Sequence, residues 1–147
     1  MKKKKYFEHM RNLHDKAVAK LANEPEMLGI EGLKAETLIY KQEFPHLKGG
    51  KKETGDLILL WKGADEKELE ITVLEVTVGP RRSYKDYSYK LRWSYEYFRQ
   101  NYAEWFRKIG QEFFHDYKIF VRTAFVNYGN QFLWEKPYIL AKRGRIY

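Results

Sequence analysis

Two acidic residues beside apolar segments could together bind a metal ion. Asp56 directly precedes the apolar run 57–61, and Glu75 lies inside a second run, 69–78. The intervening residues 63–67 (Gly-Ala-Asp-Glu-Lys) are typical of a tight turn between two antiparallel strands. The sequence therefore predicts a hairpin that carries one carboxylate on each strand.

The register of this hairpin decides whether the two carboxylates meet. If the turn is centred between Asp65 and Glu66, antiparallel pairing places Asp56 directly opposite Glu75. Opposed Cβ atoms lie roughly 5 Å apart, and like charges at that distance repel each other. A divalent cation bound by oxygen ligands would remove the repulsion. A shift of one residue in the turn would change which residues face each other.

Glu75 is expected to face the core, because side chains alternate along a strand. It shares its face with Thr77 and with three apolar residues, Leu69, Ile71 and Val73. A buried carboxylate is costly unless it is paired, hydrogen-bonded or bound to a metal.

Simpler interpretations of both acids stay open. The second strand could be an edge strand with an exposed Glu75, or Glu75 could pair with Arg82 or Lys90. Asp56 follows Gly55, and aspartate is common in turns.

The spacing of apolar residues predicts a single α/β domain over residues 1–147, in which residues 1–5 form a basic, flexible start. Apolar residues recur every three or four positions in 7–22 and 84–109, which indicates two helices. Strands are expected at 33–44, 55–62, 68–78 and 117–126, with a helical turn allowed at the start of the first and a short fifth strand around 138–141. The order αβββαβ predicts a central mixed sheet of four to five strands flanked by helices.

The composition limits the function classes. The chain has no cysteine, which excludes disulfides, thiolate zinc sites and cysteine nucleophiles. No apolar run is long enough to span a membrane, and no signal peptide is recognisable, so a cytoplasmic location is expected. The net charge of +8 favours a polyanionic partner, nucleic acid rather than a membrane surface. A basic surface that serves only solubility is the alternative.

Gly55-Asp56, followed some twenty residues later by Glu75-Val-Thr77 and then Gly-Pro-Arg-Arg, resembles the motif of the PD-(D/E)xK, or restriction-endonuclease-like, nuclease superfamily. The predicted order of elements over residues 6–126 is also similar to the core of that superfamily. A small, basic, cysteine-free version is similar to nucleases of archaeal viruses, for which the location would be the host cytoplasm.

The resemblance implies that Asp56 and Glu75 bind Mg²⁺ or Mn²⁺, together with the backbone carbonyl of Val76. Members of the superfamily often add a glutamate from the first helix, and Glu8 is the best placed candidate. A solvent-facing Glu8 in the first helical turn is an equally good interpretation.

Thr77 departs from the superfamily pattern, which usually has lysine at this position. Threonine carries no positive charge that could orient the attacking water. Lys90 or Lys85 on the following helix, or Lys62 on the neighbouring strand, could replace the lysine. Without such a replacement the protein would cut slowly, or would bind DNA without cutting it.

Basic residues after the second acid could contact phosphates. Arg81 and Arg82 lie in the connection that follows Glu75, and arginine matches the geometry of phosphate. A second basic stripe recurs every seven residues on the next helix, at Lys85, Arg92 and Arg99. A solvated helix face is the simpler interpretation of that stripe.

These features predict a metal-dependent nuclease that hydrolyses DNA. A non-catalytic nucleic-acid-binding protein on the same fold, and a basic protein-interaction domain, are the alternatives. The aromatic-rich helix could supply a homodimer interface. The histidines suggest no site, because His9 and His14 are poorly spaced to share a helical face, and His46 and His115 have no ligand partner nearby in sequence.

Overall fold

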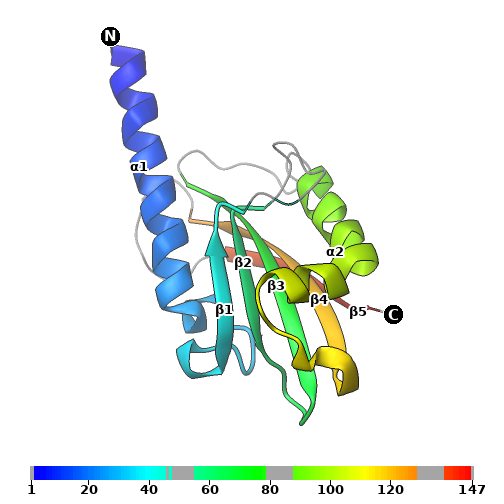
Figure 1. The fold of residues 1–147 in the computed structure, drawn as a ribbon. Helices are drawn as coiled ribbons and strands as arrows, with labels where there is room; N and C mark the ends of the chain where they lie inside the picture. Colours follow the sequence, from blue (N-terminus) through cyan, green and yellow to red (C-terminus); the bar gives the residue numbers. More distant parts are fainter. Residues whose placement is uncertain (1, 46, 48–54, 79–87, 129–137, 147) are drawn as a thin grey trace.

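The computed structural model shows a five-stranded mixed sheet between two long helices (Figure 1). It describes residues 2–45, 47, 55–78, 88–128 and 138–146. The helices are α1 (Lys2–Asn23) and α2 (Ser88–Lys108), and the strands are β1 (Leu38–Glu43), β2 (Leu57–Lys62), β3 (Glu68–Thr77), β4 (Lys118–Asn127) and β5 (Tyr138–Arg145). The predicted α/β class with a mixed sheet is confirmed.

The strands follow one another across the sheet in the order β1-β2-β3-β4-β5. All neighbours are antiparallel except β3 and β4, which are parallel because α2 connects them across one face. β3 is therefore the central strand, and every one of its residues is buried. The interpretation of Glu75 as an exposed residue of an edge strand is wrong.

The predicted register of the hairpin is confirmed. Leu57 pairs with Leu74 and Trp61 pairs with Glu70, as expected for a turn centred between Asp65 and Glu66. This paired register ends at Leu57 and Leu74. Beyond it the amide of Asp56 donates to the carbonyl of Leu74 at 2.7 Å, so the expected pairing of Asp56 with Glu75 is not part of the ladder between β2 and β3.

Each face of the sheet packs against one helix, because residues of β2 and β3 alternate between the two faces. On one face, Val18 and Leu21 of α1 pack in a cluster with Leu57, Leu74 and Val76. On the opposite face, the aromatic side of α2 packs in a second cluster with Ile58, Leu60, Ile71 and Val73. The helices thus approach β3 from opposite sides.

Some predicted boundaries are wrong. α1 begins at Lys2 and not near residue 7, because lysine is a good helix former and needs no packing to extend a helix. β1 is shorter than the predicted 33–44, since a 3₁₀ turn at Ala35–Thr37 precedes it, as had been allowed for. β5 extends to Arg145 by pairing with β4 from Asn127 back to Phe120.

α1 is longer than the sheet is tall, and its N-terminal half extends beyond the sheet in Figure 1. Neither this helix nor any other among the described residues is long and apolar enough to cross a membrane.

The close packing at Gly55 gives a first prediction about the hairpin. A Cβ atom at Gly55 would lie 2.7 Å from Cγ1 of Val73 and 2.9 Å from the carbonyl oxygen of Leu74. We expect Gly55→Ala to lower the free energy of unfolding by about 1–3 kcal/mol, because β3 must shift to make room. Urea denaturation measures the change. The control Lys62→Ala, at the exposed end of β2, should stay within about 0.5 kcal/mol. Equal stability of the two variants would contradict this packing.

Candidate active site

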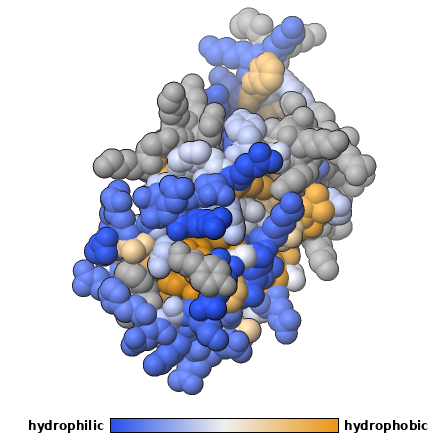
Figure 2. All heavy atoms as spheres, turned by 90° about the vertical axis from the view of Figure 1, so that its right-hand side faces the viewer, coloured by the Kyte–Doolittle hydropathy of each residue, from blue (hydrophilic) through white to orange (hydrophobic). Residues whose placement is uncertain are grey.

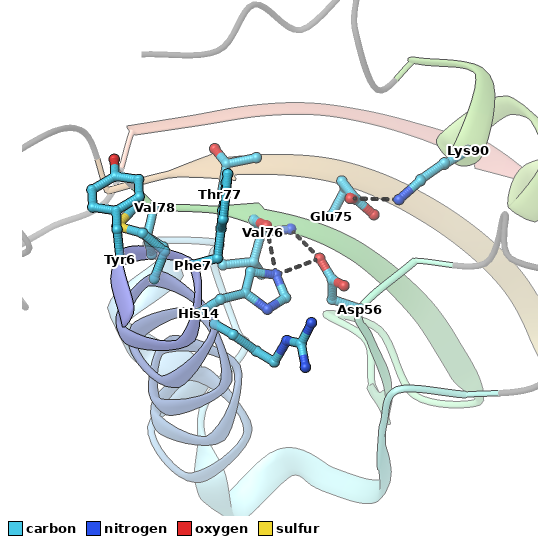
Figure 3. A pocket seen from close by; sticks show the side chains of 11 residues that line it. Tyr6, Phe7, His14, Asp56, Glu75, Val76, Thr77, Val78 and Lys90 are labelled. Atoms are coloured by element: carbon cyan, nitrogen blue, oxygen red, sulfur yellow. Dashed lines mark hydrogen bonds and ion pairs between the residues drawn. The ribbon is translucent and has the colours of Figure 1, made fainter. Parts of the chain in front are cut away.

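A cavity of about 390 Å³ lies at one end of the sheet. Five residues of α1, the loop residue Asp56, the end of β3 from Glu75 onward, and Lys90 of α2 line it. Figure 3 shows the side chains of Asp56 and His14 between Tyr6 on one side and Lys90 on the other. Both predicted acids therefore face one shared cavity.

Asp56 is fixed by β3 and by α1. Its Oδ2 accepts a hydrogen bond of 2.8 Å from the amide of Val76, and the same oxygen lies 3.2 Å from Nε2 of His14. The carboxylate is only 15% exposed. The backbone amide of Val76 thus aims the carboxylate of Asp56 at the end of the neighbouring strand.

Glu75 is 3% exposed, and its two oxygens differ in their surroundings. Oε1 lies 3.3 Å from Nζ of Lys90, whereas Oε2 is buried with no hydrogen-bond partner among the described residues. Burial and the negative charge of Asp56 raise the pKa of Glu75 to about 7, against the opposing effects of Lys90 and His14. The proposed pairing of Glu75 with Lys90 is observed, but it satisfies only half of the carboxylate.

Another buried glutamate of β3 has partners at both of its carboxylate oxygens. Glu70 is 1% exposed, but its Oε1 accepts from Nε of Arg122 and its Oε2 accepts from Nε of Arg143 at 2.9 Å. Because Glu70 is paired through both oxygens, burial alone does not explain why Oε2 of Glu75 has no partner.

His14 is a site residue that sequence analysis missed. Its Nε2 lies 2.9 Å from the carbonyl oxygen of Val76 as well as 3.2 Å from Asp56. Burial lowers the pKa of His14, but the hydrogen bond and charge of Asp56 outweigh it and raise the pKa to about 9. At neutral pH His14 is therefore a cation beside Asp56.

A sequence signal for His14 existed. His14 lies four and seven residues before Val18 and Leu21, so it shares their helical face, which packs on the sheet. A pattern of two histidines at metal-ligand spacing does not identify a histidine whose partners come from other elements of the fold.

The oxygen donors of the cavity suit a hard divalent cation. Carboxylate oxygens of Asp56 and Glu75 and the carbonyl of Val76 are ligands that Mg²⁺ and Mn²⁺ prefer, and Oε2 of Glu75 is a buried acceptor to which no described residue donates. As they stand, however, no three His, Asp or Glu side chains in the described part of the chain are grouped so that they could hold one metal ion. In this arrangement His14 contacts Asp56 and Lys90 contacts Glu75.

The remaining predicted site residues fall into three groups. Thr77 lines the cavity, buried, with its hydroxyl 3.5 Å from the carbonyl oxygen of Val126. Glu8, Arg92 and Arg99 are exposed on the helices and are not among the residues that line this cavity. Arg81, Arg82 and Lys85 lie outside the described residues.

Of the three lysines that could replace the missing motif lysine, the structure brings Lys90 to the site. Lys62 lies at the opposite end of β2 from Asp56 and is exposed.

Comparisons with models of protein families, with curated proteins and with solved structures find no match to this chain. A functional assignment therefore depends on the residues and the fold described above.

The raised pKa values predict how stability of the metal-free protein depends on pH. A group whose pKa is higher in the folded state stabilises the fold at low pH, and this contribution is lost as the pH rises through the folded pKa. The stabilisation from Glu75 is lost between its usual pKa of 4.5 and its folded pKa of about 7. The stabilisation from His14 is lost between its usual pKa of 6.5 and its folded pKa of about 9. We expect Glu75→Gln to flatten the stability curve in the lower window and His14→Gln in the upper one, each by about 1–3 kcal/mol.

Urea denaturation in EDTA across both windows measures this dependence. The exposed control Glu36→Gln should run parallel to the wild type at all pH values. If the curves of Glu75→Gln and His14→Gln also run parallel to the wild type, the electrostatic description of the site is wrong.

Proposed function

We propose that this protein is a metal-dependent nuclease that hydrolyses phosphodiester bonds in DNA. The observation that carries the proposal is the convergence of Asp56, just before β2, and Glu75 of β3 on one cavity in which a buried oxygen of Glu75 has no hydrogen-bond partner among the described residues. The position of the acids at the start of β2 and near the end of β3, in an α/β fold with a mixed sheet, supports the resemblance to PD-(D/E)xK nucleases.

Asp56, Glu75 and the carbonyl of Val76 would hold the cation. When bound, Mg²⁺ or Mn²⁺ would supply an activated water and positive charge at the phosphoryl oxygens. The amide of Val76 orients Asp56, while the positive charges of His14 and Lys90 offset the repulsion between the two carboxylates.

Lys90 takes the role of the motif lysine that Thr77 cannot fill. Burial lowers the pKa of Lys90, but the charge and hydrogen bond of Glu75 outweigh it and raise the pKa above its ordinary value. Lys90 therefore remains an ammonium ion at neutral pH, in contact with the cavity. A cation at this place can hold a phosphate oxygen and orient the attacking water.

The basic character of the chain suits a nucleic acid substrate. Arg11 lines the cavity together with the acids, and the net charge is +8. Phosphate contacts of this kind set affinity and its salt dependence, but they do not read the base sequence.

A second candidate function is nucleic-acid binding without cleavage. It is favoured by the arrangement of the described side chains, in which no three metal-binding residues are grouped and each acid already has a cationic neighbour. In that case His14 and Lys90 would be permanent counter-ions of a site that has lost its metal.

Removal of either carboxylate separates these functions. We expect Asp56→Asn and Glu75→Gln to reduce Mg²⁺- or Mn²⁺-dependent cleavage of linear DNA at least about 100-fold, because each variant loses an oxygen ligand of the cation. DNA affinity, measured in EDTA, should be unchanged or slightly higher, because a negative charge is removed. The control Glu36→Gln has an exposed side chain and should cut like the wild type.

The wild type alone already discriminates among the alternatives. Salt-sensitive DNA binding without cleavage in Mg²⁺ or Mn²⁺ would support the non-catalytic function. The absence of both binding and cleavage would leave a basic protein-interaction domain.

Lys90 provides a separate test of the catalytic arrangement. We expect Lys90→Gln to lower the cleavage rate about 100-fold, since one cation near the reacting phosphate is lost. Lys90→Arg should recover part of the rate, and Lys62→Gln should leave it unchanged. Mn²⁺ affinity, measured by calorimetry, should not fall in Lys90→Gln. A cleavage rate that survives this substitution would remove Lys90 from the mechanism.

A further inference from the structure

Exposed aromatic side chains lie in and beside the candidate active site. Six large hydrophobic side chains are exposed by 40% or more among the described residues. Tyr6 and Phe7 line the cavity itself, and the ring of Phe44 lies beside that of the lining residue His14. Tyr89 precedes the lining residue Lys90 on α2, and the other two lie on β5. Exposed aromatic side chains are normally scattered singly over a protein surface, so their clustering here is unusual.

Tyr6 and Phe7 belong to the half of α1 that extends beyond the sheet (Figure 1). Their rings are 50% and 64% exposed and meet edge to face, with centroids 5.8 Å apart. In Figure 2, apolar colour appears among hydrophilic side chains at the top of the molecule, the height at which α1 ends in Figure 1. These rings do not contribute to the core, so the fold does not require them.

Phe44 supports a functional role for the exposed rings. Its backbone has φ 49°, in the left-handed region that disfavours bulky side chains. It is nevertheless placed beside the site: its amide donates to the carbonyl of Asp56 at 2.8 Å, and its ring centroid lies 6.0 Å from that of His14. A ring retained at a strained position next to the acids is a sign of function.

The charges around the rings indicate a polyanionic ligand. Lys3, Lys4 and Lys5 are exposed in the turn of α1 before Tyr6, and Arg11 lines the cavity one turn after it. A ligand that matches this surface has both negative charges and flat apolar groups. Single-stranded nucleic acid has both, whereas the base faces of a duplex are covered by stacking.

We propose that the N-terminal half of α1 binds an unpaired segment of nucleic acid by stacking Tyr6 and Phe7 on its bases. In this way α1 would lead a single strand, or the frayed end of a duplex, into the cavity of Asp56 and Glu75. Delivery to these acids rests on the proposed nuclease function, but the binding itself does not need catalysis.

Fluorescence anisotropy in EDTA tests the binding without cleavage. The probes are a labelled oligothymidylate and a labelled duplex of the same length, and the proteins are the wild type, Tyr6→Leu, Phe7→Leu and Phe7→Tyr. Leucine keeps the helix and the apolar character but removes the ring. Tyr138→Leu is the matched control, since Tyr138 is 60% exposed on β5 and is not among the residues that line the cavity.

We expect the oligothymidylate to bind more tightly than the duplex. Tyr6→Leu and Phe7→Leu should each weaken its binding about tenfold, as the loss of one stacked base predicts, with a smaller effect on the duplex. Phe7→Tyr and Tyr138→Leu should bind like the wild type.

Two kinds of result would overturn the proposal. One is unchanged oligothymidylate binding in the leucine variants, or equally tight binding of the duplex. The other is that the leucine variants change only the oligomeric state measured by light scattering, or only the binding to anionic lipid vesicles. Either result would mean that the rings contact a second copy of the chain or a membrane. If the nuclease function alone is wrong, DNA stays uncut in Mg²⁺ while the ring-dependent binding in EDTA remains.

Discussion

The repulsion between the buried carboxylate of Glu75 and the half-buried carboxylate of Asp56 is the constraint to which the rest of the site responds. Asp56 and Glu75 lie just beyond the last pair of β2 and β3, Leu57 and Leu74, where the low exposure of both side chains limits the screening of their charges by water. His14 reaches Asp56 from one helix and Lys90 reaches Glu75 from the other. This compensation is incomplete, because one oxygen of Glu75 has no partner in the part of the chain that the structure describes and the pKa of this residue remains raised to about 7. A divalent cation would supply the missing positive charge.

The fold explains why this arrangement arises at one end of the sheet. β2 and β3 are buried on both faces, so each helix must cover one face and thereby brings one cation to the same strand end. The cavity forms where the sheet stops while α1 continues. The aromatic rings and basic residues on that extension are then presented beside the acids. The proposed binding surface and the candidate active site would thus be two consequences of a helix longer than the sheet it packs on.

The sequence indicated that Asp56 and Glu75 could share a site, but it did not indicate the contact of His14 with Asp56. The difference has physical reasons. The pairing of Leu57 with Leu74, which brings their neighbours Asp56 and Glu75 to the same end of the hairpin, follows from a short turn, which is a local property. Whether His14 meets Asp56 depends on how α1 lies across the sheet, which no local pattern encodes. The contact of Lys90 with Glu75 depends in the same way on the placement of α2 against β3. The order of helices and strands along the chain was accessible from periodicity, whereas the start of α1 was not, because exposed lysines extend a helix without any packing signal.

A crystal structure of the protein with Mn²⁺ tests the central claim most directly. The account predicts one anomalous peak in the cavity, about 2.0–2.4 Å from a carboxylate oxygen of each acid and from the carbonyl oxygen of Val76. His14 would then have released that carbonyl. An empty site at millimolar Mn²⁺, with Lys90 still paired to Glu75 and His14 still bound to Asp56, would contradict it.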